Sequence, residues 1–375
     1  MGTDSVIYIR TDGNSQIATG HLVRCLSIAR ALHREAADKC SLSICFLLSD
    51  EESKRLLERF FEIENEFKWH ILPGADYQHP ELELNELLAL GNSSRPILLI
   101  DSYFVTEKYL TALHNVFTLV YLDDLRAFDY PVDMVINYDL LTPAMRKDYE
   151  QFYHSAHKKL LGGGYAPLRP QFWENPSLQT EGTVSNVKAH HIEDSGQKEG
   201  SVHILIASGG SDPYHTTLQL VRELSKQFPT GYCFDLIVGA YNPDKEELQK
   251  LAKNSPIVLH EGVTQMAALM ASCNLAISAA GTTLYELCAV GIPTASFVLA
   301  DNQLASAKAF EECHIIPYLG DVRTNENDVI KKATTWVASN SHPDPSKNKN
   351  QGNREVDGKG ALRIAKELLF YDHNV

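Results

Sequence analysis

The sequence has no excess of basic residues: 34 lysines and arginines stand against 48 aspartates and glutamates, which gives a formal charge of −14. A protein that coats DNA or RNA needs a basic face, so this balance argues against nucleic acid as a partner. A small anionic ligand held by backbone amides is still compatible with it. The 375 residues, 44% hydrophobic and 22% charged, are typical of a globular protein of two domains.

Several chemical motifs are also missing. The seven cysteines are scattered, odd in number and include no C-x-x-C pair, so we interpret them as reduced and structural. The sequence contains no H-E-x-x-H or clustered Cys/His spacing, and no G-x-G-x-x-G, Walker or G-x-S-x-G sequence. We therefore expect neither a bound metal nor a cofactor.

The first residues and the long apolar segment give no sign of membrane targeting. The first residues lead directly into a strand-like stretch without a basic n-region and an apolar h-region, so a signal peptide is not expected. The long apolar segment 273–300 contains Glu286, Gly291 and Pro293 and fits a buried strand, loop, helix and strand better than a membrane span. We expect a cytoplasmic monomer or small homo-oligomer with no stable membrane insertion.

Short apolar runs alternate with helix-period segments along most of the chain. The first half predicts strands at 6–10, 42–48, 68–72, 97–101, 118–122 and 134–137, and helices at 21–35, 51–61, 80–90 and 105–115. The second half predicts strands at 202–207, 234–239, 256–260, 274–278 and 294–298, and helices at 214–227, 243–253, 264–272, 282–290 and 301–312. This pattern predicts an α/β chain of two doubly wound Rossmann-type domains with a cleft between them.

Two polar segments interrupt this alternation. Residues 174–200 contain few apolar side chains and precede a new strand, which is typical of a linker or a surface loop. Residues 339–358 are similarly polar and precede a terminal helix at 360–369. The predicted domains are therefore 1–173 and 201–375, joined by 174–200, with the terminal helix assigned to the second domain.

The loop after the first strand, residues 11–20, leads into a helix that begins near His21. Its small residues, Gly20 among them, let a backbone approach a ligand, and ligands of such sheets bind beyond the carboxyl ends of strands. His21 at this junction can orient or deprotonate water near neutral pH. From spacing alone, a histidine that caps or packs against the helix start is the favoured alternative.

The loop at 207–213 follows the first strand of the second half. Gly209, Gly210 and Ser211 supply exposed amides and a hydroxyl suited to a phosphate ahead of a helix. The alternative is an ordinary glycine-rich turn whose helix is capped by Ser211 or Asp212.

Residues 278–286 repeat this layout of strand, small-residue loop and helix. Gly281, Thr282 and Thr283 can hold a diphosphate, and Glu286, about one turn later, can accept both hydroxyls of a ribose. The alternative for Glu286 is a surface carboxylate near the helix dipole. With two such loops, the second half is the better candidate for a nucleotide.

Polar residues end three further strands. Asp301 can serve as a helix N-cap, while Asn302 can present its amide to a sugar or a water. Tyr103 follows the strand at 97–101. The adjacent pair Asp123 and Asp124 is a poor metal site, because neighbouring residues in an extended chain point to opposite faces.

Taken together, these loops resemble a known family. The stretch from Arg10 to Ala29 resembles the opening of the UDP-sugar hydrolases of the pseudaminic acid pathway, and related spore coat polysaccharide biosynthesis proteins share the motif. The segments 208–212, 278–286 and 299–303 are similar to the family's later signatures, and 161–169 to the stretch before its linker. The resemblance covers residues 6 to about 315.

The resemblance implies a GT-B arrangement and a metal-independent hydrolysis of UDP-2,4-diacetamido-2,4,6-trideoxy-β-L-altropyranose by inversion. His21 would position or activate the water, and Asn302 and Tyr103 would contact the sugar or the water. The amides of Gly209, Gly210 and Gly281, with Thr282 and Thr283, would hold the diphosphate, and Glu286 the ribose.

Two departures and two alternatives qualify this expectation. Ala18 and Ala280 stand where the family usually or often has glycine, a departure that concerns the sugar more than the fold. A GT-B glycosyltransferase that uses a UDP-amino sugar donor is one alternative function, and a non-catalytic nucleotide-sugar-binding protein is the other.

Overall fold

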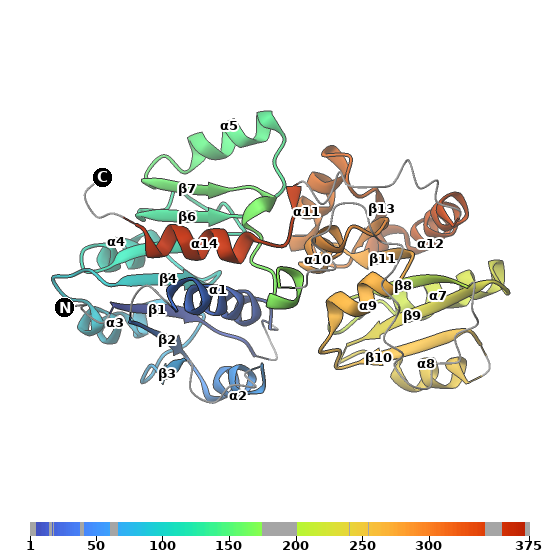
Figure 1. Cartoon of the computed structure of the whole chain (residues 1–375), viewed down its shortest axis with the longest axis horizontal. Coiled ribbons are helices and arrows are strands. Elements are labelled where there is room, and N and C mark those ends of the chain that lie inside the picture. The colour runs from blue at the N-terminus through green and yellow to red at the C-terminus, as the bar shows by residue number, and fades with distance from the viewer. Residues whose placement is uncertain are drawn as a thin grey trace. The chain divides into compact units, whose positions relative to one another are not determined.

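The computed structural model of this chain describes residues 5–14, 17, 19–37, 41–60, 67–174, 201–239, 241–253, 255–341 and 355–371. It divides into two compact units, Met1–Pro170 with Gly358–Val375, and Gln171–Asp357 (Figure 1). Most of the two polar segments, 175–200 and 342–354, and also Ala18, lie outside the described residues.

The first unit is built around a seven-stranded parallel sheet. Its strands are β1 (Ser5–Thr11), β2 (Leu42–Leu48), β3 (Lys68–Ile71), β4 (Ile97–Asp101), β5 (Thr118–Leu122), β6 (Met134–Asn137) and β7 (Lys158–Leu161). Its α-helices are α1 (Gly20–Ala36), α2 (Glu51–Phe60), α3 (Leu84–Leu90), α4 (Glu107–His114), α5 (Pro143–Phe152) and α14 (Gly360–Leu369). Short 3-10 turns lie at η1 (Pro80–Leu82), η2 (Gly163–Tyr165) and η3 (Pro170–Phe172).

The strand order of this sheet is β3-β2-β1-β4-β5-β6-β7. The chain moves outward from β1 to β3 and then returns to β4, on the other side of β1. In doubly wound sheets, such a reversal opens a crevice at the carboxyl ends of the two central strands, where ligands bind. The topology therefore predicts that a ligand of this sheet would bind at the loops that follow β1 and β4.

The second unit repeats the design with a six-stranded parallel sheet in the order β10-β9-β8-β11-β12-β13. Its strands are β8 (Val202–Ala207), β9 (Tyr232–Val238), β10 (Ile257–Glu261), β11 (Leu275–Ala279), β12 (Thr294–Val298) and β13 (Tyr318–Asp321). Its helices are α7 (Thr216–Gln227), α8 (Lys245–Ala252), α9 (Met266–Ser272), α10 (Thr283–Val290), α11 (Asp301–Glu312) and α12 (Val322–Asn340). The reversal here lies between β8 and β11.

The central strands of both sheets have little solvent-facing surface, and this explains their apolar sequences, whereas the edge strand β3 is mostly exposed. Every residue of β5 and of β11 is buried. In the second unit, α7 and α12 bury Val221 and Ala333 against Ile204 and Ile206 of β8. Strands covered on both faces are near-continuous apolar runs, so the prediction of two doubly wound parallel sheets is confirmed.

Four elements lie beyond the predicted set. The strands β7 and β13 are only four residues long and contain lysine, glycine or aspartate, so each lacks an apolar run. The helix α5 begins at Pro143 after the cap Thr142, and α12 follows the cap Asp321. The strands β7 and β13 each form an edge of their sheet, next to the last predicted strand of the unit.

The terminal helix α14 belongs to the first unit, which corrects its assignment to the second domain. Its apolar face, including Ala361 and Ile364, is fully buried, and the helix packs along α1 (Figure 1). A Cβ on Gly360 would lie 2.1 Å from the carbonyl oxygen of Ala166, so glycine is required for this close approach. The amphipathic pattern predicts the helix but not which surface its apolar stripe covers.

Among the described residues, no helix is long and apolar enough to cross a membrane. The apolar segment at 273–300 forms β11, α10 and β12, as the sequence predicts.

Candidate functional site

The loops at the carboxyl ends of β1 and β4 bring a histidine and an aspartate together. His21 is the second residue of α1, and Asp101 is the last residue of β4. The His21 Nδ1 and the Asp101 Oδ1 lie 2.6 Å apart, and both side chains are buried. Arg24 Nη2 lies 3.0 Å from the same nitrogen. Because an ionised carboxylate only accepts, the contact with Asp101 requires a proton on Nδ1, and a ring with that proton alone has a lone pair on Nε2. The partner of His21 is therefore a distant strand end and not its own helix start.

Arg24, one helical turn beyond His21, binds the same carboxylate from another direction. Its Nε donates to Asp101 Oδ2 at 2.6 Å and its Nη2 to Oδ1 at 2.5 Å, in a bidentate pair. Burial alone would raise the pKa of Asp101, but the charges of Arg24 and His21 and their hydrogen bonds hold it well below its usual value. Asp101 is therefore ionised and can stabilise an imidazolium at His21.

Tyr103 extends this cluster toward a second aspartate. Its ring meets the His21 ring edge-on, with the centroids 4.4 Å apart. Its hydroxyl donates to Asp124 Oδ2 at 3.1 Å, and Arg24 Nη1 donates to the same oxygen at 2.7 Å. Burial and the neighbouring Asp124 carboxylate raise the pKa of Tyr103. The phenol therefore remains protonated, with its proton directed at Asp124 and a lone pair left on its oxygen.

A separate buried charge cluster fixes the loop before α1. Arg10 Nε donates to Glu83 Oε1 at 2.7 Å, and Arg10 Nη1 donates to Asp12 Oδ2 at 2.5 Å. The other Asp12 oxygen accepts the Ser49 N–H at 2.7 Å, and the Tyr109 hydroxyl donates to Glu83 at 2.7 Å. Through its contacts with Arg10 and Ser49, Asp12 holds in place the loop at 11–20, which the sequence predicts to approach a ligand.

A small recess opens beside these residues. His21, Asp101 and Tyr103 line it together with Ile17 and Phe104 from the two loops. The histidine, its aspartate partner and the tyrosine therefore face one shared space.

Two more acidic groups lie along the carboxyl edge of this sheet. Asp123 accepts the hydroxyls of Tyr130 at 2.9 Å and Tyr153 at 2.6 Å, whereas its neighbour Asp124 faces Arg24. The two adjacent carboxylates serve different partners, as expected for an extended chain. Asp139, after β6, accepts the Tyr149 hydroxyl at 3.0 Å, and burial raises the pKa of Asp139 to about 6.

The loop after β8 presents open backbone. Gly209, Gly210 and Ser211 are exposed, and a Cβ added at either glycine would meet nothing within 4 Å. The other side of this loop is packed, because a Cβ on Gly239 would lie 2.3 Å from the Gly210 oxygen, which also accepts the Tyr241 N–H at 3.1 Å. The loop is therefore held from one side and accessible from the other.

Asp212 closes the start of α7. Its Oδ1 accepts the Thr216 N–H at 3.0 Å, and its Oδ2 accepts the Thr217 N–H at 2.8 Å. His215 occupies the N-cap position of α7, and Asp212, one of the two predicted caps, bonds the first amides of the helix from outside it. Two amides of this helix N-terminus are occupied, so an anion at this loop would depend on residues 209–211.

The loop after β11 supplies a second open surface. The Gly281 N–H already donates to the Ala279 oxygen at 2.9 Å, so the geometry differs from the expectation that this amide faces a ligand. Gly281 contributes space instead, since a Cβ there would meet nothing within 4 Å. Thr282 is exposed and Thr283 begins α10, where the helix dipole favours negative charge.

Ala280 and Glu286, in the same segment, are both buried. Ala280 is 1% exposed, so its methyl group lies inside the protein and does not narrow the open side of the loop. Glu286 is 9% exposed, so the alternative of a helix-surface carboxylate is wrong.

The start of α11 carries Asp301 and Asn302, both exposed. Asp301 is the first helical residue and pairs with Arg323 at 2.7 Å, so the prediction that it is the N-cap is wrong. Gln303 Oε1 accepts the Leu299 N–H at 2.8 Å and holds this turn instead. The Asn302 side chain is left on the exposed side of the turn.

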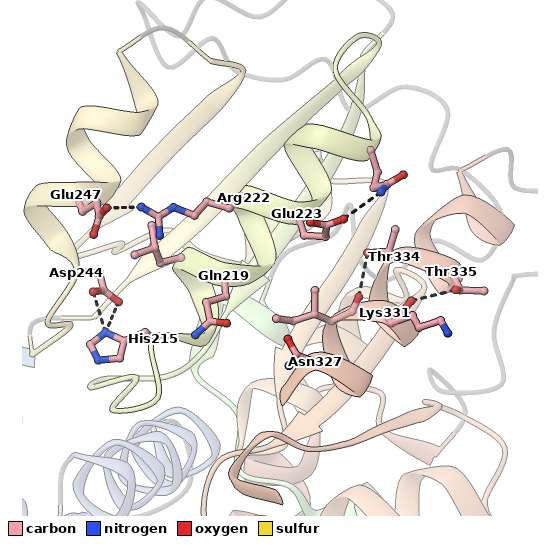
Figure 2. A pocket seen from close by; sticks show the side chains of 13 residues that line it. His215, Gln219, Arg222, Glu223, Asp244, Glu247, Asn327, Lys331, Thr334 and Thr335 are labelled. Atoms are coloured by element: carbon pink, nitrogen blue, oxygen red, sulfur yellow. Dashed lines mark hydrogen bonds and ion pairs between the residues drawn. The ribbon is translucent and has the colours of Figure 1, made fainter. Parts of the chain in front are cut away.

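A larger hollow of about 880 Å³ lies between α7 and α12 (Figure 2). Charged pairs line it, including His215 with Asp244 at 2.8 Å, and Arg222 with Glu247. Its walls are helix side chains, and it contains none of the predicted ligand residues.

Within the described residues, the structure brings His21 and Tyr103 together in the first unit. It places Gly209, Gly210, Ser211, Gly281, Thr282, Thr283, Glu286 and Asn302 in the second unit. The sequence analysis missed the buried cation Arg24 and gave Asp101 no role as the partner of His21. An arginine three residues after a histidine in a predicted helix indicates that the two side chains lie on the same face of that helix.

Several curated proteins are related to this chain at low identity. The uncharacterized protein MJ1062 of Methanocaldococcus jannaschii is 26% identical over 80% of this chain and 56% of its own length. A pseudaminic acid cytidylyltransferase and UDP-2,4-diacetamido-2,4,6-trideoxy-beta-L-altropyranose hydrolase of Helicobacter pylori is 26% identical over 70% of this chain and 45% of its own length. The chain thus spans about half the length of these two relatives.

The UDP-2,4-diacetamido-2,4,6-trideoxy-beta-L-altropyranose hydrolase of Campylobacter jejuni is 24% identical over 75% of this chain and 86% of its own length. Solved structures with a similar fold include Acinetobacter baumannii MurG, with a TM-score of 0.65, 12% identity and coverage of 97% of this chain and 99% of MurG. Arabidopsis thaliana UGT89C1 complexed with UDP gives a TM-score of 0.61 at 10% identity, over 98% and 100% of the two chains.

The similar structures cover nearly the whole chain, and a family model matches most of its second half. Two parallel α/β sheets with these topologies match GT-B structures, so the predicted GT-B fold is confirmed. Residues 203–362 match the glycosyltransferase family 28 C-terminal domain. The chain therefore has the GT-B fold, and its match to the glycosyltransferase family 28 C-terminal domain covers less than half of its length.

Proposed function

We propose that this chain is a nucleotide-sugar hydrolase that releases UDP from a UDP-2,4-diacetamido-2,4,6-trideoxyhexose. The observation that carries the proposal is the pair of His21 and Asp101 at the reversal point of the first sheet. The names of the H. pylori and C. jejuni relatives support the substrate class, and the family 28 match supports a nucleotide sugar.

In this proposal, Nε2 of His21 orients a water molecule and accepts its proton. The water oxygen bonds to the anomeric carbon as the bond from that carbon to the phosphate oxygen breaks, so UDP leaves with the bonding electrons and the configuration inverts. Asp101 stabilises the resulting imidazolium, as an ionised partner of a catalytic histidine does. A general base of this kind contributes a factor of about 10² to 10⁴ in rate.

Tyr103 and Asn302 are the proposed contacts to the sugar or the water. The Tyr103 hydroxyl directs its proton to Asp124, so its oxygen is a hydrogen-bond acceptor beside the His21 ring. The exposed amide of Asn302 supplies both a donor and an acceptor. Gly20, whose Cβ position is open, allows the sugar to approach the start of α1.

The second unit is the proposed nucleotide side. Gly209, Gly210 and Ser211 would bind one phosphate, and the α10 N-terminus at Thr282 and Thr283 would take the charge that develops on the departing UDP. Gly281 would leave room for that phosphate, and Glu286 would bind the ribose hydroxyls. The proposed reaction is metal-independent and belongs to the biosynthesis of pseudaminic-type nonulosonic acids in the cytoplasm.

The decisive experiment compares His21→Asn with His33→Asn, a change to an exposed histidine on the same helix. With UDP-2,4-diacetamido-trideoxyhexoses as substrates, we expect His21→Asn to lower the rate of UDP release by about 10² to 10⁴. We expect the affinity for UDP, measured by calorimetry, to stay within a factor of about two, since the base makes no ground-state contact with UDP.

The control His33→Asn should retain the wild-type rate. Full activity of His21→Asn would disprove the role of His21. NMR of the released sugar reports the anomeric configuration, and retention would contradict direct attack by water.

A GT-B glycosyltransferase is the second candidate, because the family 28 match covers residues 203–362. Incubation of the protein with donor alone discriminates between the two. A hydrolase releases UDP without an acceptor, whereas a transferase excludes water from its donor. Tight binding of the UDP-sugar without turnover in either assay would instead indicate a non-catalytic binding protein.

A further inference from the structure

A second cluster of chemically active side chains lies on one face of the second sheet. His203 on β8 is in register with Cys233 on β9, and Asp235 lies two residues further along β9. Their neighbours Ile204 and Phe234 point into the apolar core of the unit. Because side chains alternate along a strand, the histidine, the cysteine and the aspartate share the opposite face.

The polar atoms of this cluster converge. The His203 Nδ1 lies 2.8 Å from Asp235 Oδ2, and the candidate ligand atoms of His203, Cys233 and Asp235 all lie within 4.8 Å of one another. From β10, His260 Nε2 lies 2.8 Å from the other Asp235 oxygen. Asp235 is 3% exposed, so this carboxylate is buried between two imidazole rings.

The donor set suits a borderline-soft cation. One imidazole nitrogen, one thiol and one carboxylate are the ligand types of zinc sites, with metal–ligand bonds of about 2.0–2.3 Å. A tetrahedron with such bonds separates its ligand atoms by about 3.3–3.7 Å. The separation of 2.8 Å between His203 and Asp235 is shorter than this range, and all three ligand atoms lie within 4.8 Å of one another, so side-chain rotations would form the site with a water molecule as the fourth ligand.

We propose that His203, Cys233 and Asp235 bind a zinc ion, and that His260 orients Asp235 as a partner that does not contact the metal. Binding replaces the thiol proton of Cys233, which is released to solvent, with a bond to the metal. The proton between His203 Nδ1 and Asp235 Oδ2 also leaves, to solvent or to Nε2, so that a neutral imidazole binds the metal. The ion would tie β8 directly to β9, and through His260 the carboxylate would hold β10. This role is structural and does not depend on the proposed hydrolase activity.

The position of the cluster supports a structural role. His203 is the second residue of β8, five residues before Ser208 in the loop proposed for phosphate, a separation of about 16 Å along a strand. Cys273, at the end of α9, is also close, because the Asp235 charge is among the causes, after burial, that raise the pKa of its thiol. The sequence does not reveal this set, since its members are dispersed over three strands.

The test uses the full chain stripped with a chelator and then titrated with Zn²⁺ against a chromophoric chelator. Co²⁺ serves as the spectroscopic probe, because a thiolate bound to cobalt gives a charge-transfer band. We expect one equivalent of metal per chain, a thiolate band with Co²⁺, and a higher Tm with Zn²⁺. His203→Gln and Cys233→Ser should each weaken binding at least about ten-fold.

Cys288→Ser, a change to another buried cysteine outside the cluster, is the matched control and should keep both the affinity and the band. Circular dichroism checks that each variant is folded. The proposal is overturned if the wild-type chain binds less than one equivalent, if its cobalt complex lacks the thiolate band, or if Cys288→Ser loses the band while Cys233→Ser keeps it. Any of these results would leave the cluster as a buried ion pair only.

Discussion

The two sheets reverse their strand order in the same way, yet the loops at the two reversal points differ in composition. In the first unit, the crevice between β1 and β4 is formed by buried charged side chains, with Arg24 joining His21, Asp101 and Asp124. In the second unit, the loops after β8 and β11 present glycines and hydroxyls, and their backbone lies beside open space. One topology thus supports two different kinds of surface.

This contrast separates proton transfer from anion binding. Side chains such as His21 can gain or lose a proton, but they need partners that hold them at a fixed angle. Backbone amides and a helix N-terminus carry a fixed partial charge that does not titrate. The first unit should therefore respond strongly to single substitutions and to pH, and the second unit weakly to both.

The largest effect is expected from Asp101→Asn. The change removes the charge that holds His21 in its tautomer and leaves the buried Arg24 without its bidentate partner. We expect UDP release to fall by at least about 10³, as for the loss of an orienting aspartate. Breaking a buried ion pair should also lower the free energy of unfolding in urea by about 3 kcal/mol.

Asp124→Asn is the matched control for this substitution. It also removes a charge next to Arg24, but it leaves the pair of Arg24 with Asp101 intact, and the Asp124 side chain is 24% exposed. We expect a stability loss of about 1 kcal/mol. Equal losses in the two variants would contradict the central place of Asp101.

The first unit also shows what the sequence could and could not predict. The apolar runs identify β1 and β4, and the loop composition identifies His21. The partnership of His21 with Asp101 joins residues 80 positions apart, so it depends on which strands are neighbours. Local patterns do not encode strand order, and for the same reason α14 was assigned to the wrong unit.

A second difference between the units is expected in the response of stability to pH. Burial raises the pKa of Asp139 to about 6, above the value near 3.9 expected in an unfolded chain. The folded state therefore binds the proton more tightly, and its stability falls as the pH rises from about 4 to 6. Asp139→Asn removes this group, so we expect the variant to gain about 2–3 kcal/mol relative to wild type between pH 4 and pH 7.

Urea unfolding of both proteins at the two pH values measures this gain. The charges of Asp124 and Asp123 also contribute to the raised pKa of Asp139, so the double difference reports Asp139 together with its interaction with these two carboxylates. A difference that does not change between pH 4 and pH 7 would show that Asp139 is ionised as readily when folded as when unfolded.

In the second unit, the sequence analysis identified the exposed loops more fully than their hydrogen bonding. Gly209, Gly210 and Thr282 are exposed, as glycine-rich and hydroxyl-rich loops after buried strands predict. The Gly281 amide is already used inside its own turn. Composition indicates that a backbone can be open, but the direction of each N–H depends on dihedral angles that the residue types leave free.

Gly210→Val tests whether the open space beside this loop is used. A Cβ there meets nothing within 4 Å in the protein and the residue is exposed, so the free energy of unfolding should change by less than about 0.5 kcal/mol. If a phosphate occupies that space, the Kd for UDP should rise about ten-fold, or 1.4 kcal/mol. Calorimetry with UDP gives the answer, and an unchanged Kd would exclude this loop from the nucleotide site.

The smallest loss of UDP affinity is expected from Asp212→Ala, although its stability should change. The change removes the cap on Thr216 and Thr217 and places alanine at a φ of 45°, so stability should fall by about 1–2 kcal/mol. Asp212→Asn keeps an acceptor and tolerates this φ, so it should lose less.

Affinity for UDP should move in the other direction in Asp212→Ala. Loss of the carboxylate frees two amides at the start of α7 and removes a negative charge close to residues 209–211. An anion bound by this loop would then be held as tightly as before, or more tightly, even as the protein becomes less stable. A parallel loss of stability and affinity would mean that Asp212 shapes the loop itself, and the backbone of the second unit would then depend on a side chain as the first unit does.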